Sequence, residues 1–157
     1  WYKDNPKLFF VNQLERIENV PLQVVYASSQ EPREGDAAHL TDGETSTIWH
    51  TMYSVTLAKY PHWVDFDAAS VKNMKGFIYT PRMDSYNGYG KDYEIYVSQD
   101  GKEWGEPVMK GSFERTGEAH KVMFEKPVKA RYIRFRALSE QRGNDYASGA
   151  EFGLVAE

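Results

Sequence analysis

The chain has 157 residues, a length that fits one domain around one core. Its residues are 41% hydrophobic and 27% charged, which excludes a disordered chain, and no apolar run approaches the roughly 20 residues of a membrane-spanning helix. The net charge of −4 argues against a nucleic-acid partner, and the lack of cysteine excludes disulfides and thiolate metal sites. Because the chain begins at Trp1 with neither a methionine nor a leader, we expect a fragment of a longer or processed protein.

Short segments with period-two alternation recur along the chain and predict strands with one buried face. Residues 1–20 alternate less cleanly, so we expect a linker or edge segment there, followed by one domain over 21–157. A single helical turn is predicted over 36–41, with Asp36 as its cap. The predicted strands cover 22–28, 62–67, 73–80, 92–98, 108–113, 120–124, 131–138 and 148–155.

Turn signals separate these segments. Asn87-Gly88 and Asp100-Gly101 are dipeptides typical of tight hairpins. The prolines at 61, 81, 107 and 127 stand just before or after predicted strands, where a missing N–H does little harm. Eight short strands at this spacing predict an all-β fold, an antiparallel sandwich.

Two oxygen-rich segments predict a metal site that joins distant parts of the chain. Residues 42–49 read Asp-Gly-Glu-Thr-Ser-Thr-Ile-Trp, and Glu151 lies in an apolar run near the C-terminus. Calcium binds six to eight oxygens from carboxylates, hydroxyls and carbonyls, and a carboxylate in an apolar strand needs a partner to offset its desolvation. The alternatives are a plain Asp-Gly turn and a Glu151 side chain that faces solvent.

Three further segments carry side chains suited to binding a sugar: 49–53, 81–89 and 143–146. Loops cluster at the ends of a sandwich, where imidazole, guanidinium and carboxamide groups provide directional hydrogen bonds and aromatic rings stack on a pyranose. Plainer interpretations stay open: a packed His50, an Arg82 that pairs with Asp84, a type I′ turn at Asn87-Gly88, and scattered surface tyrosines. We expect Trp49, Trp63 and Trp104 in the core or at strand edges.

Several separated motifs together resemble one family. They are Leu-Thr-Asp-Gly at 40–43 with Thr47 and Trp49, His-Trp-Val-Asp-Phe-Asp at 62–67, Tyr-Thr-Pro-Arg at 79–82, Tyr-Glu-Ile-Tyr-Val-Ser at 93–98 with Asp100-Gly101 and Trp104, Ala-Arg-Tyr-Ile-Arg at 130–134, and Ala150-Glu151. This pattern, which covers about 25–155, resembles F5/8 type C (discoidin-like) domains. Within them it is most similar to carbohydrate-binding module family 32, which is attached to bacterial glycoside hydrolases of the chitobiase, hexosaminidase or sialidase type.

The resemblance implies a β-sandwich jelly roll with a structural calcium and a site for galactose or N-acetylgalactosamine. The implied calcium ligands are the His39 carbonyl, Asp42, Glu44, Thr47, the Ala150 carbonyl and Glu151. The implied sugar contacts are the polar side chains of His50, Arg82 and Asn87 and the aromatic platforms of Tyr53 and Tyr146. Glu44 stands where the family more often has Asn or Asp, and tyrosine replaces the more frequent Trp or Phe at both platforms.

The resemblance further implies a non-catalytic, monomeric module that recognises a glycan and holds a parent glycoside hydrolase near it. Such a module would be extracellular, periplasmic or at the cell surface. The alternative is a discoidin-like module that adheres to proteins or membranes through Met52, Tyr53, Met83 and Tyr86, although the acidic net charge argues against anionic lipid. Catalysis by the domain itself is not expected, because no sequence pattern nominates a pair of glycosidase carboxylates.

Overall fold

The computed structural model describes residues 20–157. Most of the segment predicted as a linker or edge, 1–20, therefore lies outside the described residues, and only Val20 is placed, in an antiparallel bridge with Leu154. The described elements, in chain order, are β1 Gln23–Ala27, the 3-10 helix η1 Ala37–Thr41, β2 Trp49–His50, β3 His62–Thr80, β4 Asp92–Ser98, β5 Met109–Ser112, β6 His120–Ala137, β7 Ser148–Gly149 and β8 Glu151–Ala156.

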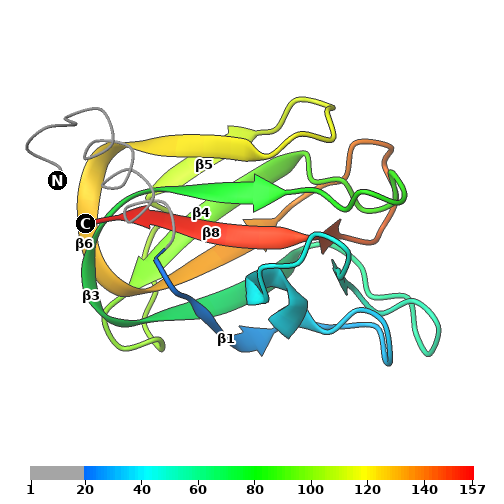
Figure 1. Cartoon of the computed structure of the whole chain (residues 1–157), viewed down its shortest axis with the longest axis horizontal. Helices are drawn as coiled ribbons and strands as arrows, with labels where there is room; N and C mark the ends of the chain where they lie inside the picture. The colour runs from blue at the N-terminus through cyan, green and yellow to red at the C-terminus, as the bar shows by residue number, and fades with distance from the viewer. Residues whose placement is uncertain (1–19) are drawn as a thin grey trace, which may run out of the picture.

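The strands form the antiparallel β-sandwich that the sequence predicts (Figure 1). One path of paired strands runs β1-β3-β6-β4-β5, and β8 adds to β3. The long strands β3 and β6 are paired along most of their length and curve together, so each contributes to both layers. The first part of β3 pairs with β1 and the second part with β8, which places β8 over β1 across the core.

Two pairs of predicted strands are single strands in the structure. The segments 62–67 and 73–80 are both parts of β3, and 120–124 and 131–138 are both parts of β6. The β3 register shifts between Asp67 and Lys72, where Ala69 has a φ of 69°, so the strand bends without ending. The prediction that Pro127 flanks a strand is wrong, because it lies within β6. It is accommodated there because residues 124–127 have no partner in β3.

Other boundaries differ for local reasons. The predicted strand 148–155 is split at Ala150 into β7 and β8, which pair with different neighbours. Strand β2 was not predicted, since two residues carry no periodicity. The helical turn is confirmed: the Asp36 side chain caps η1 by accepting a hydrogen bond from the N–H of Ala38 at 2.9 Å.

Neither predicted hairpin dipeptide forms a type I′ turn. That turn needs a positive φ at both central residues. In each of these dipeptides the glycine, Gly88 or Gly101, has a positive φ, but the residue before it does not. Asp100 instead accepts hydrogen bonds from the N–H groups of Glu103 and Lys102, which hold its pKa at about 2. The dipeptides therefore shape longer loops instead of two-residue hairpins.

Aromatic rings fill the space between the two layers. Phe66 of β3 stacks on Phe152 of β8 with ring centroids 4.5 Å apart, and Phe77 and Phe135 pack around this pair. Trp49 is fully buried, as predicted. Stacked and edge-on aromatic pairs contribute beyond their buried area, so this ladder is a main source of the fold's stability.

Trp63 and Trp104 are half-buried and occupy neither the core nor a strand edge, which corrects the prediction: Trp63 lies in β3 between β1 and β6, and Trp104 lies in the loop between β4 and β5. The guanidinium of Arg134 lies between the two rings, 5.7 Å and 4.3 Å from their centroids, and also donates two hydrogen bonds to Asp65.

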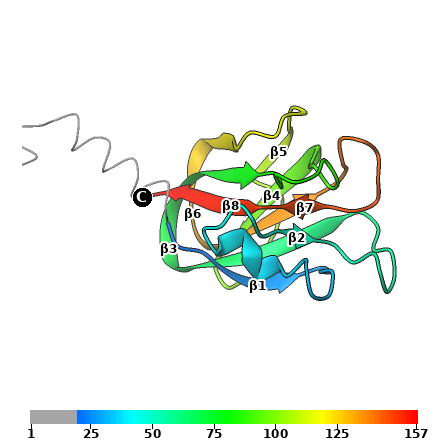
Figure 2. The same cartoon turned by 45° about the vertical axis from the view of Figure 1, so that its right-hand side comes forward.

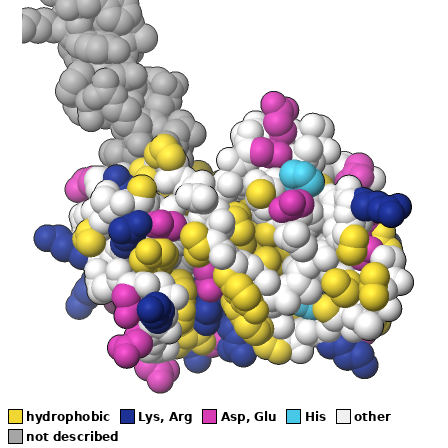
Figure 3. Space-filling view, turned by 90° about the horizontal axis from the view of Figure 1, so that it is seen from below, with side chains coloured by type: hydrophobic (Ala, Val, Ile, Leu, Met, Phe, Trp, Pro, Cys, Tyr) yellow, Lys and Arg dark blue, Asp and Glu magenta, His cyan; other side chains and the backbone are white. Residues whose placement is uncertain are grey.

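In Figure 3, the face seen from below shows basic and acidic side chains interspersed with apolar ones. No helix within residues 20–157 is long and apolar enough to cross a membrane.

Candidate functional site

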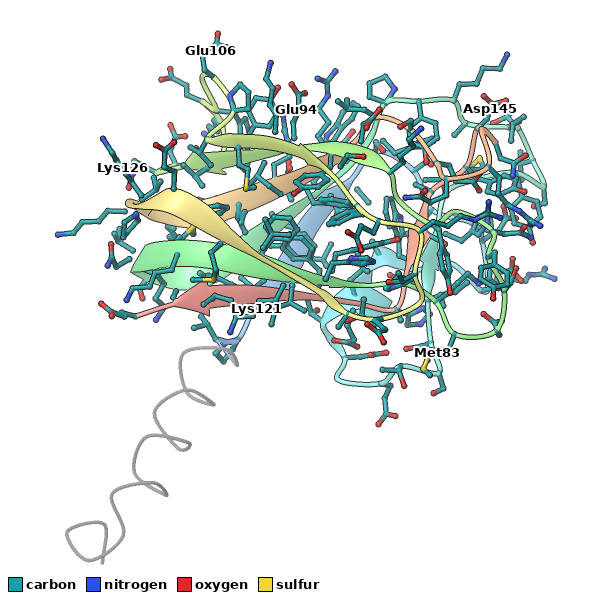
Figure 4. All side chains as sticks on the ribbon, turned by 90° about the horizontal axis from the view of Figure 1, so that it is seen from above. Met83, Glu94, Glu106, Lys121, Lys126 and Asp145 are labelled. Carbon is teal, nitrogen blue, oxygen red and sulfur yellow. The ribbon has the colours of Figure 1, made fainter. Side chains whose placement is uncertain are left out.

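Figure 2 shows the loops that lie opposite the curved end of the sandwich. Residues of these loops line a cavity of about 390 Å³. Its wall contains every side chain that the sequence nominated for sugar contact, together with two that it did not, Glu34 and Leu57. Figure 4 shows Met83 and Asp145, from two of the loops concerned, at the same end of the molecule and far from Lys126. The nominated residues are His50, Tyr53, Arg82, Asn87 and Tyr146.

Pairing between strands β2 and β7 brings the loop of residues 49–53 next to the loop of residues 143–146. His50 pairs with Ser148 and Trp49 with Gly149 in an antiparallel ladder of two residues each. Beyond it, the N–H of Thr51 donates to the carbonyl of Ala147 at 3.0 Å, and the Ala147 N–H donates back to the Thr51 hydroxyl at 3.0 Å. Residues almost a hundred positions apart thereby form one wall of the cavity.

His50 lies between two tyrosine rings. Its centroid is 5.0 Å from that of Tyr53, which is edge-on, and 5.3 Å from that of Tyr146, which is tilted. The Nδ1 atom lies 2.6 Å from the Thr51 carbonyl, and because a carbonyl can only accept, Nδ1 carries the hydrogen. Although His50 is only 4% exposed, it is no mere packed histidine, because it reaches the cavity and its Nε2 is an acceptor in the neutral ring.

Arg82 both pairs with Asp84 and lines the cavity. Its Nε and Nη2 atoms donate to the two Asp84 oxygens at 2.8 Å and 3.0 Å, and this bonding to Asp84 raises the pKa of Arg82 further above its ordinary value. The fork fixes the plane of the guanidinium and uses only part of its five donors. The ion pair is thus compatible with ligand binding and orients the remaining N–H groups.

The loop that carries Asn87 is fastened to β7. The Ser148 hydroxyl donates to the Asn87 carbonyl at 2.6 Å, and the Ser148 N–H donates to the Gly88 carbonyl at 3.1 Å. A side chain at Gly88 would collide with Ser148, and its φ of 86° also favours glycine. The Asn87 side chain accepts a 3.4 Å hydrogen bond from the Tyr146 hydroxyl, so these two cavity residues touch.

A buried carboxylate that the sequence did not nominate links two of the loops that line the cavity. Glu140 is 2% exposed and accepts hydrogen bonds from the N–H groups of Gly88 at 2.6 Å, Asn144 at 3.0 Å and Arg142 at 3.1 Å. These donors belong to the Asn87 loop and the Tyr146 loop. Glu140 therefore sets the distance between the two loops without itself lining the cavity.

We expect Glu140→Ala to lower the free energy of unfolding by on the order of 1.5–3 kcal/mol, because three backbone N–H groups, of which that of Gly88 is buried, lose a charged acceptor. Chemical denaturation measures this change, and ligand affinity should fall with it. Glu118→Ala, which removes an exposed glutamate, serves as the control and should leave the denaturation midpoint unchanged. An unchanged midpoint in Glu140→Ala would show that the loops are held by other contacts.

A second buried carboxylate, Glu31, supports the loop that carries Tyr53. It accepts hydrogen bonds from the N–H groups of Tyr53 and Ser54 at 2.7 Å and 3.1 Å, and one from the Ser54 hydroxyl. Burial by itself raises the pKa of Glu31, but these bonds outweigh it and hold the pKa below its ordinary value. The Tyr53 hydroxyl donates to Glu34 at the cavity rim, and this bond raises the pKa of Tyr53.

The nominated metal ligands also come together, where the turn after η1 meets the start of β8. The Asp42 carboxylate accepts hydrogen bonds from the N–H of Glu44 at 2.8 Å and from the Thr47 hydroxyl. The His39 carbonyl faces the Asp42 N–H at 3.4 Å, and Ala150 precedes Glu151 at the head of β8. The Glu44 carbonyl is 3.3 Å from the Thr47 hydroxyl, so Glu44 presents its backbone to this turn.

Glu151 shows a polar group without a partner. Its Oε1 atom is buried and has no hydrogen-bond partner in the protein. Burial raises the pKa of Glu151 to about 8, and the adjacent Asp42 carboxylate contributes to the same shift. Among residues 20–157 no cluster of three or more His, Cys, Asp or Glu side chains could hold a metal. Two carboxylates supplemented by a hydroxyl and carbonyls nevertheless fit a hard, oxygen-binding cation.

Comparison with known proteins identifies relatives of this chain. Residues 24–152 match the F5/8 type C domain family. A sialidase of Micromonospora viridifaciens is 36% identical over 157 residues, which are 98% of this chain and 24% of the sialidase. A galactose oxidase of Gibberella zeae is 36% identical over 116 residues, 72% of this chain and 17% of that enzyme. The chain thus spans about a quarter or less of these curated relatives.

Solved structures of similar fold include two modules of Clostridium perfringens. A family 32 carbohydrate-binding module in complex with GalNAc-β-1,3-galactose has a TM-score of 0.79 and 29% identity, and the match covers 87% of this chain and 99% of that one. The family 32 module of NanJ in complex with galactose has a TM-score of 0.76 and 26% identity, covering 87% and 97%. These neighbours are binding modules, and the present domain is likewise non-catalytic. From the match over residues 24–152, the chain belongs to the F5/8 type C domain family.

Proposed function

We propose that the domain binds a terminal sugar of galactose configuration in the 390 Å³ cavity. The observation that carries the proposal is the convergence of His50, Arg82 and Asn87 beside the rings of Tyr53 and Tyr146. Two structural neighbours hold galactose or a GalNAc-galactose disaccharide, which supports this class of ligand.

The chemistry of the wall suits a sugar with an axial hydroxyl. His50 Nε2 offers an acceptor, the free N–H groups of Arg82 offer donors, and the Asn87 amide offers both, so a hydroxyl can donate and accept at once. The tyrosine rings offer apolar faces to the C–H side of a pyranose. With few polar contacts and one or two rings, the dissociation constant should be roughly millimolar to tens of micromolar, about 4 to 6 kcal/mol.

Calorimetric titration with methyl β-galactoside, methyl α-N-acetylgalactosaminide and methyl β-glucoside tests this function. We expect at least one of the first two to bind within the stated range. The glucoside should bind at least tenfold more weakly, because its equatorial 4-hydroxyl cannot reach the same three polar groups. Equal affinity for all three, or no heat with any, would contradict recognition of galactose configuration.

We further propose that Asp42, Thr47 and Glu151 bind a structural calcium ion with the carbonyls of His39, Glu44 and Ala150. The partnerless Oε1 of Glu151 next to a second carboxylate supports this assignment, since a divalent cation would neutralise both. Bound calcium supplies positive charge that holds the η1 turn against β8 and takes no part in sugar chemistry.

The domain's biological role, as we propose it, is to hold a longer glycan-processing enzyme near its substrate outside the cell. Relatives such as the sialidase and a lacto-N-biosidase of Bifidobacterium bifidum are far longer than the region they share with this chain. Weak binding suffices for such a role, because tethering raises the effective concentration of the enzyme at the glycan. As one monomeric module in a larger chain, the domain would add affinity to that of any neighbouring module.

A further inference from the structure

A second cavity of about 360 Å³ is lined mainly by residues of the 81–89 loop, which also contributes Arg82 and Asn87 to the first cavity. The two cavities share a boundary, the bidentate ion pair in which Arg82 lines the first and Asp84 lines the second. The second cavity lies along the same 81–89 loop, and Figure 4 shows Met83 at the loop end of the molecule. A ligand chain that left the first cavity past Arg82 would therefore meet Asp84 at the second cavity.

The second cavity contains an exposed aromatic ring with a firm base. Tyr86 is 59% exposed, and its ring centroid is 5.3 Å from that of Tyr89, which is buried. The Tyr89 hydroxyl donates to the Arg82 carbonyl at 2.8 Å, which fastens the base of this wall to the boundary of the first cavity. An exposed tyrosine held in place in this way offers a sugar an apolar face with little loss of side-chain freedom.

The boundary also offers polar atoms to the second cavity. The Asp84 side chain is 70% exposed, and Arg82 uses one bonding position on each of its oxygens. The other lone pairs remain available to hydroxyl donors. Bonding to Arg82 keeps the pKa of Asp84 below its ordinary value, so the group stays an anionic acceptor at neutral pH. Asp84 is the one carboxylate among the described residues that line this cavity, and the Arg142 guanidinium, 6.0 Å from the Tyr86 ring centroid, offsets its charge, so the surroundings suit a neutral sugar.

We propose that the second cavity is a subsite for the neutral sugar next to the terminal one, so that the domain reads at least a disaccharide. The penultimate ring packs on Tyr86, and one of its hydroxyls donates to Asp84. This inference rests on the proposed function, because the terminal sugar must occupy the first cavity. It extends that function by making linkage, and not only the terminal residue, a determinant of affinity.

The test compares methyl β-galactoside with β1,3- and β1,4-linked disaccharides of terminal galactose and N-acetylglucosamine by calorimetric titration. In the wild-type domain, at least one disaccharide should bind about 3- to 10-fold more tightly than the monosaccharide, as one added ring contact predicts. Tyr86→Ala should reduce this ratio to about one without changing the affinity for methyl β-galactoside. Tyr86→Phe should keep most of the gain, because the ring is retained.

Tyr26→Ala is the matched control. Tyr26 is exposed to a similar extent, 53%, but lies in β1 against Trp63, away from both cavities, and its loss should alter neither affinity. If wild type binds both disaccharides no more tightly than the monosaccharide, the subsite is refuted while the proposed function stands. An equal loss of both affinities in Tyr86→Ala would also refute it, as a merely structural effect. A wild type that binds none of the three sugars would refute the proposed function and the subsite with it.

Discussion

Arg82→Ala is expected to weaken binding of methyl β-galactoside by about 10- to 100-fold. A hydrogen bond between a charged donor and a sugar hydroxyl contributes about 1.5–3 kcal/mol, and each 1.4 kcal/mol is a factor of ten in affinity. The melting temperature should change by no more than a few degrees, because Asp84 is largely exposed and stays hydrated when its partner is lost. Titration and thermal melting on the same samples separate these two effects.

Two further variants define the cause of the loss. Arg82→Lys retains the charge but not the planar fork, so its affinity should fall between those of wild type and Arg82→Ala. Arg115→Ala removes an exposed arginine outside the cavity wall and should bind as wild type does. Wild-type affinity in Arg82→Ala would mean that the guanidinium only pairs with Asp84, the plainer of the two interpretations that its sequence allows.

Calcium removal is expected to lower the melting temperature by about 5–10 °C. At a hundredfold excess over its dissociation constant, a ligand of the folded state stabilises it by about 2.7 kcal/mol, and a domain of this size shifts by about 2–4 °C for each kcal/mol. Melting in EDTA after verified metal removal, compared with millimolar calcium, measures the shift. An identical melting temperature in both solutions would contradict the proposed calcium site.

Glu151→Gln should remove most of this dependence on calcium. In the calcium-free domain the folded state holds the Glu151 proton up to about pH 8, whereas the unfolded state releases it near 4.5. The free energy of unfolding contributed by this group therefore falls as the pH rises from about 4.5 to about 8. Glutamine mimics the protonated acid, so in EDTA the variant should melt above wild type at pH 8 and beside it at pH 4.5.

In calcium the order should reverse at pH 8, because the variant lacks an anionic ligand and gains little from the ion. This reversal in the order of the two melting temperatures distinguishes a metal ligand from a carboxylate that is merely buried. A variant that is less stable than wild type in both solutions would show that the carboxylate stabilises the fold without calcium, through its hydrogen bonds with the Gly43 and Glu44 backbone, and would contradict the metal site.

Most of the cavity wall was predicted from the sequence, but Glu34, Leu57 and the supports of the wall were not. His50, Arg82 and Asn87 lie in separated segments of the chain, and the resemblance of its motifs to one family nominated them together. Glu31 and Glu140 act through backbone N–H groups of distant loops, and any carboxylate can do so, which leaves no pattern to find. Only the folded chain shows which two of the 23 acidic residues are used in this way.

The same contrast applies to the fold. Alternation of polar and apolar residues located β4 to the residue, because Tyr93, Ile95 and Val97 share one face of the strand and the first two are buried. The curved strands β3 and β6 were each predicted as two, since their side chains lose the alternation at the bend and regain it beyond. The two-residue strand β2 exists only because β7 pairs with it, and pairing between remote segments is a tertiary property.

The direction of β8 has a practical consequence. This strand runs away from the cavity, and its last residues lie at the curved end of the sandwich (Figure 1). A biotin tag or a fluorescent label joined behind Glu157 would therefore leave the opposite pole unobstructed. On a sensor chip, domains captured by such a tag would all have the same orientation, with the cavity facing the flowing sample.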